Sequence, residues 1–309
     1  MRKIPYLHIV LFALTFCFTL MAGANFKGID VFQHPAQIWE GLDFSFPLMT
    51  ILLTHELAHY IAAKKHHIEA TLPYFIPLPP TPNIPTIGTL GAFIKMRSPI
   101  RTRRALVDVG AAGPIAGFLL SLAVTVIGLS YSSIVPVQGA KGVLGLGDSL
   151  LFSFLTRLVI GVPPESHEIL LQPMAFAGWL GFFVTSLNLI PIGQLDGGHI
   201  AFAFLGKRHR LLSRILVATL LIMGVIAILQ VVANVAEVSL PNGMSQLINR
   251  FPDLWAGWAF WGAIMLILGI KHPPVIHWEI PLDGRRRFVG AIAFIIFIIT
   301  FMPAPFKIF

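Results

Sequence analysis

Residues 46–65 read FPLMTILLTHELAHYIAAKK. The segment is mostly apolar and has about the 20 residues that a transmembrane helix needs. Three ionisable side chains, His55, Glu56 and His59, stand inside it. Because each ionisable group costs a few kcal/mol within a bilayer, the segment predicts a membrane helix that carries a functional site.

The composition of the whole chain favours a membrane location. Of its 309 residues, 56% are hydrophobic and 12% are charged, whereas a water-soluble chain carries about 25% charged residues. This excludes a soluble globular protein. The formal net charge of +8 is interpreted as a topology signal, and no nucleic-acid partner is expected. The single cysteine, Cys17, excludes an intrachain disulfide and a thiolate zinc site.

Seven apolar stretches are candidate membrane spans, so the predicted fold class is an all-α polytopic membrane protein. Their approximate limits are 4–24, 46–64, 105–130, 172–195, 211–236, 254–271 and 287–303. The first span also has features of a signal peptide, whose removal would leave six spans. When the gaps between spans are numbered alternately, most Lys and Arg residues fall on one side. We therefore expect a multi-pass protein with its N-terminus inside, and the lack of transit-peptide character favours a prokaryotic cell membrane.

Two further segments fit neither a span nor an ordinary loop. Residues 71–94 are apolar but contain six prolines, which exclude a continuous helix. We expect residues 86–94 to form short strands, giving a membrane-embedded β-hairpin or re-entrant segment. Residues 149–161 are too short to span and are predicted to lie against the outer interface. The expected division of the chain is an N-terminal span and outer loop (1–43), a membrane core with the candidate site (44–206) and a three-span C-terminal region (207–309).

The residues Thr54-His55-Glu56-Leu57-Ala58-His59 have the spacing of a metal-binding helix. On a helix, His55 and His59 lie one turn apart on one face, so both imidazoles can bind one metal ion. With zinc held there, Glu56 can take a proton from the bound water, which is the chemistry of metal-assisted peptide hydrolysis. The alternative is a polar contact between helices or a proton relay.

A catalytic zinc ion usually has three protein ligands, so a third ligand is expected at membrane depth. The candidates are Asp108, Asp196, His199 and His8. Asp196 stands out because the surrounding NLIPIGQLDGGH, residues 188–199, is rich in proline and glycine, which permit unwound backbone. At membrane depth such backbone survives only where it lines a cavity or is buried in protein. The alternative role for Asp196 is a helix C-cap.

Four stretches resemble the site-2 protease family of intramembrane zinc metalloproteases, in particular its simpler bacterial, archaeal and chloroplast members. They are THELAHYIAA, TIGTLGAFIKMRSPI, DVGAAGPIAGF and NLIPIGQLDGGH. The stretches run in family order across about half of the chain, and the first and last are the most specific. The resemblance implies that His55, His59 and Asp196 bind one zinc ion and that Glu56 is the general base. It also implies that Asn188 contacts the substrate or the developing oxyanion, with an interhelical hydrogen bond as the alternative.

The TIGTLGAF segment resembles the family's membrane-embedded strand region, where an unwound substrate can add as a strand. Thr89, Gly91 and Phe93 are the expected substrate-lining residues, and a plain structural hairpin is the alternative. The expected function is thus an intramembrane zinc metalloendopeptidase in the lipid bilayer that cleaves single-span membrane-protein substrates (regulated intramembrane proteolysis). The alternatives are a divalent-metal or ion transporter that uses buried His and Asp, and a zinc-bearing scaffold. The oligomeric state is not predicted.

Overall fold

The computed structural model describes residues 5–81, 86–136, 144–164, 166–235 and 254–308. Four basic residues that contributed to the predicted topology, Arg2, Lys3, Lys141 and Arg250, lie outside these ranges. Most of the described chain is helical, as expected from its apolar stretches.

The helices in chain order are α1 (Tyr6–Phe26), α2 (Leu42–Lys65), α3 (Arg103–Ser130), α4 (Leu150–Val159), α5 (Pro173–Leu189), α6 (Asp196–Leu205), α7 (His209–Val235), α9 (Gly257–Leu268) and α10 (Gly284–Thr300). Two short 3-10 helices, η1 (Pro35–Gly41) and η2 (Gly206–Arg208), precede α2 and α7. Within the described residues, three helical ranges are long and apolar enough to cross a membrane: α1, α3 and Asp196–Val232. The membrane-protein class is therefore supported, whereas the count of seven spans stays a prediction.

The predicted fourth span, 172–195, contains helix α5 and, as expected, unwound backbone at its C-terminal end. Helix α5 ends at Leu189, and residues 190–195 form turns because Pro191 lacks an amide donor and Gly193 has a positive φ of 53°. The unwound backbone stops there: the two glycines that follow Asp196 are helical, within the first turn of α6. The alternative of Asp196 as a C-cap was wrong, since this residue begins α6.

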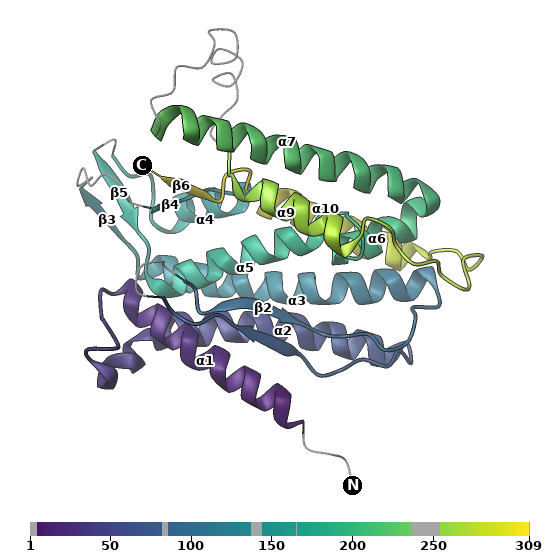
Figure 1. Ribbon diagram of the computed structural model, residues 1–309, viewed down its shortest axis with the longest axis horizontal. Helices are drawn as coiled ribbons and strands as arrows, with labels where there is room; N and C mark the ends of the chain where they lie inside the picture. Colours follow the sequence, from purple (N-terminus) through teal and green to yellow (C-terminus); the bar gives the residue numbers. More distant parts are fainter. Residues whose placement is uncertain (1–4, 82–85, 137–143, 165, 236–253, 309) are drawn as a thin grey trace.

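Helix α3 lies at the centre of the helix assembly and contacts α2, α5, α6 and α10. Figure 1 shows α2, α3 and α5 running side by side, with α1 along one edge and α7 along the other. The backbones of α3 and α5 approach closely because small residues meet, as where Gly128 contacts Ala175. The large side chains Phe44, Trp179 and Phe182 are fully buried in the core beside this contact. Gly206, with a φ of 56°, turns the chain between α6 and α7.

Three short antiparallel strand pairs accompany the helices. β1 (Tyr74–Pro77) pairs with β2 (Thr89–Phe93), β3 (Ser133–Pro136) with β5 (His167–Leu170), and β4 (Leu144–Leu146) with β6 (Phe306–Ile308). Strand β2 lies within the predicted 86–94 segment, and its depth in a bilayer stays a prediction. Helix α4 lies within the predicted 149–161 segment, with Phe152 and Leu155 buried and Phe154 and Leu158 exposed. This amphipathic pattern is typical of an interfacial helix.

Candidate metal centre

Two histidines one helical turn apart point from α2 toward α3. His55 and His59 are both buried, and their Nε2 atoms are 3.0 Å apart. The helix continues through both residues because the surrounding Leu, Ala and Thr side chains favour or tolerate helix, and the polar pair lies on the buried side. Local sequence therefore forms this half of the site.

The N-terminus of α6 brings Asp196 to the same point. Its Oδ2 atom lies 3.4 Å from His55 Nε2 and 3.2 Å from His59 Nε2. Residues 190–195 join α5 to α6, which both pack against α3, and so place this carboxylate at the start of α6. Among the described residues, these three form the one group of His, Cys, Asp or Glu side chains close enough to hold a metal ion.

The distances within this group suit a zinc ion. Ligand atoms about 2.1 Å from a tetrahedral ion stand roughly 3.4 Å from one another, and the three separations here are 3.0, 3.2 and 3.4 Å. Two imidazole nitrogens and a carboxylate oxygen are also a donor set that zinc accepts in catalytic sites. The group can thus hold one zinc ion.

A backbone carbonyl orients one of the imidazoles. The Nδ1–H group of His59 donates to the carbonyl oxygen of Val109 in α3 at 2.8 Å. Because a carbonyl oxygen only accepts, Nδ1 carries the proton and Nε2 presents its lone pair to the metal position. This contact selects the tautomer that metal binding requires.

Glycines of α3 leave the space that the two histidines occupy. A Cβ on Gly113 would overlap the His59 ring, and a Cβ on Gly117 would lie 3.1 Å from His55 Nδ1. Neither glycine was predicted to form part of the site. Their signal was their spacing, since positions 110, 113 and 117 share one helical face.

Glu56 lies beside the group and near the strand pair. Its side chain is buried, and the backbone N–H of Ile94, directly after β2, donates a hydrogen bond to it. The same carboxylate is close enough to interact electrostatically with His59 and Asp196. The strand pair and the metal group therefore adjoin the same carboxylate.

Asn188 lies near the C-terminal end of α5 and faces α2. Its Nδ2 atom is 3.3 Å from His55 Nε2, which matches the interhelical contact considered in the sequence analysis. The amide is also at the edge of the metal group, so both expected roles of Asn188 remain compatible with its position.

The three residues expected to line a substrate path lie on β2 but differ in orientation. Thr89 is buried, and its hydroxyl donates to Ile76 O at 3.0 Å and accepts from Gly91 N at 2.9 Å. Gly91 has a φ of 102° and open space on its Cβ side. Phe93 is exposed and stacks on Tyr74. Thr89 thus links β2 to β1 through its hydroxyl group, while Gly91 and Phe93 face outward.

The other candidate ligands have different partners. His8 Nδ1 lies 3.0 Å from the carbonyl oxygen of Pro73. Asp108, in α3, accepts hydrogen bonds from Arg286 in α10. His199 Nδ1 is 2.7 Å from His272 Nε2. None of the three belongs to the group that can hold a metal.

These features define a helical membrane protein with a buried His–His–Asp metal centre. The model of Peptidase family M50 matches residues 43–231. The chain therefore belongs to this family, and the resemblance to site-2 proteases is confirmed.

Three relatives illustrate the similarity. The chain is 30% identical over 210 residues to "Probable zinc metalloprotease EGY2, chloroplastic" of Oryza sativa subsp. japonica, which covers 66% of this chain and 36% of that protein. It is 33% identical over 172 residues to "Probable zinc metalloprotease EGY1, chloroplastic" of Arabidopsis thaliana, covering 54% and 30%. It is 29% identical over 174 residues to "Probable zinc metalloprotease EGY3, chloroplastic" of Oryza sativa subsp. japonica, covering 52% and 28%. The chain thus spans about a third of the length of these relatives. No solved structure gives a significant match.

Proposed function

We propose that this protein is an intramembrane zinc metalloendopeptidase that hydrolyses peptide bonds within transmembrane segments of other membrane proteins. The observation that carries the proposal is the convergence of His55, His59 and Asp196 within 3.4 Å of one another, beside the buried Glu56. Membership of Peptidase family M50 supports the same chemistry. It does not favour the ion-transporter alternative.

The proposed ligands are His55, His59 and Asp196. A zinc ion held by them would supply Lewis-acid chemistry and lower the pKa of a coordinated water to about 7. Glu56 is proposed to accept a proton from the attacking water and to donate it to the leaving amine of the cleaved peptide bond. Its hydrogen bond from Ile94 N–H holds the carboxylate in place while it exchanges the proton.

Asn188 is proposed to stabilise negative charge on the substrate carbonyl oxygen. Its side-chain amide can donate two hydrogen bonds and already lies 3.3 Å from His55 Nε2. A donor aimed at a developing oxyanion can be worth a few kcal/mol of transition-state stabilisation.

The proposed substrate is a single-span membrane protein whose helix unwinds before cleavage. Strand β2 pairs with β1 along one side, and the segment that follows it contacts Glu56 through Ile94. A substrate strand added next to β2 would place its peptide bonds near that carboxylate. Gly91 and Phe93 are proposed to contact it directly, and Thr89 to hold the strand pair in shape.

We propose a topology of seven membrane spans with the N-terminus inside. We also propose that the chain divides into an N-terminal span and outer loop (1–43), a membrane core with the metal centre (44–206) and a three-span C-terminal region (207–309). This is supported by basic segments that gather at one end of the helix assembly. There the backbone N–H of His277 bonds to Arg101 O, and Arg104 lies 3.8 Å from Asp283. The turn between α6 and α7 lies at the same end, on the right in Figure 1. The chain is an integral membrane protein, and we propose a prokaryotic cell membrane, although the relatives named above are chloroplastic.

Cleavage in proteoliposomes tests the proposal. The full-length protein and a tagged single-span substrate are co-reconstituted, and fragments are quantified on gels. Glu56→Gln is expected to lower the cleavage rate by at least about 100-fold while keeping one zinc ion per chain. Glu69→Gln, in the segment between α2 and β1, is the matched control and should cleave normally. Cutting by Glu56→Gln at the wild-type rate would exclude the role of this carboxylate.

Metal content gives a second readout that does not depend on activity. Asp196→Ala removes one of three ligands, so its zinc affinity should fall by at least about 100-fold with the helical content unchanged. Asp30→Ala, which is remote from the metal group in sequence and is not one of its ligands, should retain zinc. Metal flux without proteolysis in the same vesicles would instead support the transporter.

A further inference from the structure

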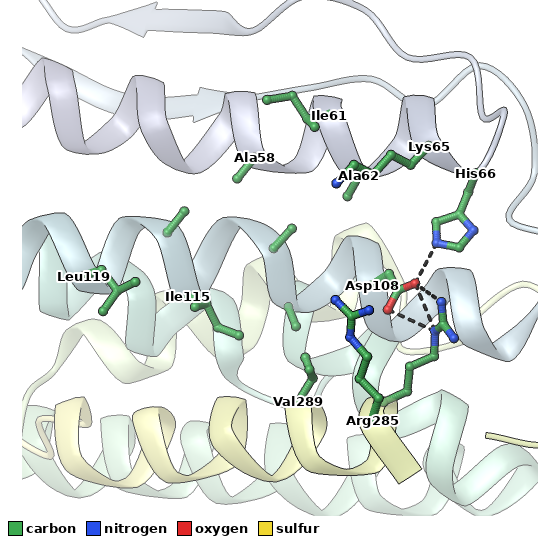
Figure 2. A pocket seen from close by; sticks show the side chains of 14 residues that line it. Ala58, Ile61, Ala62, Lys65, His66, Asp108, Ile115, Leu119, Arg285 and Val289 are labelled. Carbon is green, nitrogen blue, oxygen red and sulfur yellow. Dashed lines mark hydrogen bonds and ion pairs between the residues drawn. The ribbon is translucent and has the colours of Figure 1, made fainter. Parts of the chain in front are cut away.

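A groove of about 710 Å³ lies between α2, α3 and α10. None of the proposed ligands lines it, nor do Glu56 or Asn188. Its volume is within the range of about 300–1,000 Å³ that is typical of small-molecule sites. We call it the α2–α10 groove. Figure 2 shows it with α2 on one side, α10 on the other and α3 between them.

The two ends of the α2–α10 groove differ in polarity. Figure 2 shows Lys65, His66, Asp108 and Arg285 gathered at one end. The other end is apolar and includes Leu119. Between the ends, the small side chains of Ala58, Ala62, Ala112 and Ala116 leave the groove open. A ligand that fits must carry a polar head and a long apolar tail.

Two cations at the polar end are free to bind an anion. Asp108 is engaged by Arg286, whose Nε and Nη2 atoms lie 2.9 and 2.5 Å from Asp108 Oδ2. Among the described residues, neither Lys65 nor Arg285 has an ion-pair partner, and both are exposed. The polar end therefore has an excess of positive charge that favours an anionic head group.

The length of the apolar part matches one leaflet of a bilayer. From Asp108 to Leu119, α3 rises by roughly 16 Å at 1.5 Å per residue. Half of a hydrocarbon core about 30 Å thick is about 15 Å. A transmembrane peptide would extend across both leaflets and need not carry an anion to Lys65 and Arg285. The dimensions and the charge thus favour a lipid over a peptide.

We propose that the α2–α10 groove binds one anionic phospholipid. Its phosphate would contact Lys65 and Arg285, and an acyl chain would follow the alanine-lined floor toward Leu119. Helix α2 forms one wall and also carries His55 and His59. The bound lipid would therefore contact the helix that holds half of the candidate metal centre. The proposal concerns binding and stands independently of the protease activity.

Native mass spectrometry of the full-length protein in detergent tests this site. Phosphatidylglycerol and phosphatidylcholine with identical acyl chains are titrated separately. The wild-type protein should bind phosphatidylglycerol at least about tenfold more tightly. The double variant Lys65→Gln/Arg285→Gln should lose this preference. The matched control, Lys64→Gln/Arg287→Gln, changes the same charge on the same two helices outside the groove and should keep it.

A second variant tests the apolar part. Ala116→Leu fills the floor and should weaken the binding of both lipids, whereas Ala116→Gly should not. Equal losses in the two double variants, or none in either, would overturn the site in favour of general surface electrostatics. Displacement of the lipid by inorganic phosphate at equal concentration would indicate a free-anion site. Displacement by a single-span peptide would indicate a peptide groove. Either displacement would overturn the lipid assignment.

Discussion

Replacing Gly113 by alanine is expected to weaken zinc binding. An added Cβ would lie against His59 Nε2, closer than van der Waals contact allows. This nitrogen faces both His55 Nε2 and Asp196 Oδ2. The imidazole therefore cannot move away from the new methyl group without changing its position within the metal group.

The size of the effect follows from the displacement. Non-bonded heavy atoms are stable at about 3.5–4.0 Å, so the ring must move by roughly 1.4 Å or more. That movement also strains the 2.8 Å hydrogen bond from His59 Nδ1 to Val109 O. Disturbing a partner that orients a metal-binding histidine typically costs 10- to 100-fold in affinity, or about 1.4–2.8 kcal/mol. Alanine in place of glycine would otherwise stabilise a helix by about 0.5–1 kcal/mol.

Competition with a fluorescent chelator measures the zinc Kd of the purified protein, and circular dichroism measures its helical content. Gly117→Ala is the matched control on the same face of α3, because its Cβ would meet His55 Nδ1 at 3.1 Å and needs only a small adjustment. We expect it to lose less than about threefold in affinity. If Gly113→Ala bound zinc as tightly as the wild type and cleaved substrate at the same rate, the packing argument would be refuted.

Two further predictions concern stability in detergent. Asp108→Asn should lower the free energy of unfolding by about 1–2 kcal/mol, less than for a fully buried pair, because the Asp108 and Arg286 side chains are 27% and 23% exposed. A double-mutant cycle with Arg286→Gln measures this coupling, and a value near zero would contradict it. Burial lowers the pKa of His272, which faces His199, below 6.5. As the pH falls, this imidazole is therefore protonated at a higher pH in the unfolded chain than in the folded protein. The free energy of unfolding should then decrease as the pH drops below about 7. His272→Gln should make the unfolding midpoint depend less on pH, whereas His277→Gln, at an exposed residue, should not. If the midpoint changed equally with pH in both variants, His272 would be excluded as the source of the pH dependence.

The first half of the metal group was predictable from the sequence. The spacing of His55 and His59 needs only a helix, and an apolar run of span length predicts one from local properties alone. The six prolines likewise excluded a helix at 71–94, where the structure has β1 and β2. Such predictions succeed because helix periodicity and proline geometry act over a few residues.

The third member of the group was chosen by the tertiary structure. The sequence favoured Asp196 over Asp108 and His199 because of its proline- and glycine-rich surroundings, but it did not determine which side chain reaches the histidines. Asp196 alone of these reaches the histidines, because the turns at 190–195 end α5 and start α6 against α3. Asp108 instead pairs with Arg286, 178 residues further along the chain.

The pairing of β4 with β6 and the α2–α10 groove also join segments that are far apart in the chain. Local patterns carry no information about such distances, since the free energy that selects these contacts comes from packing and charge pairing between helices. Spacing within one helix thus determined which residues can bind a metal, and the packing of α2, α3 and α6 decided which of them meet.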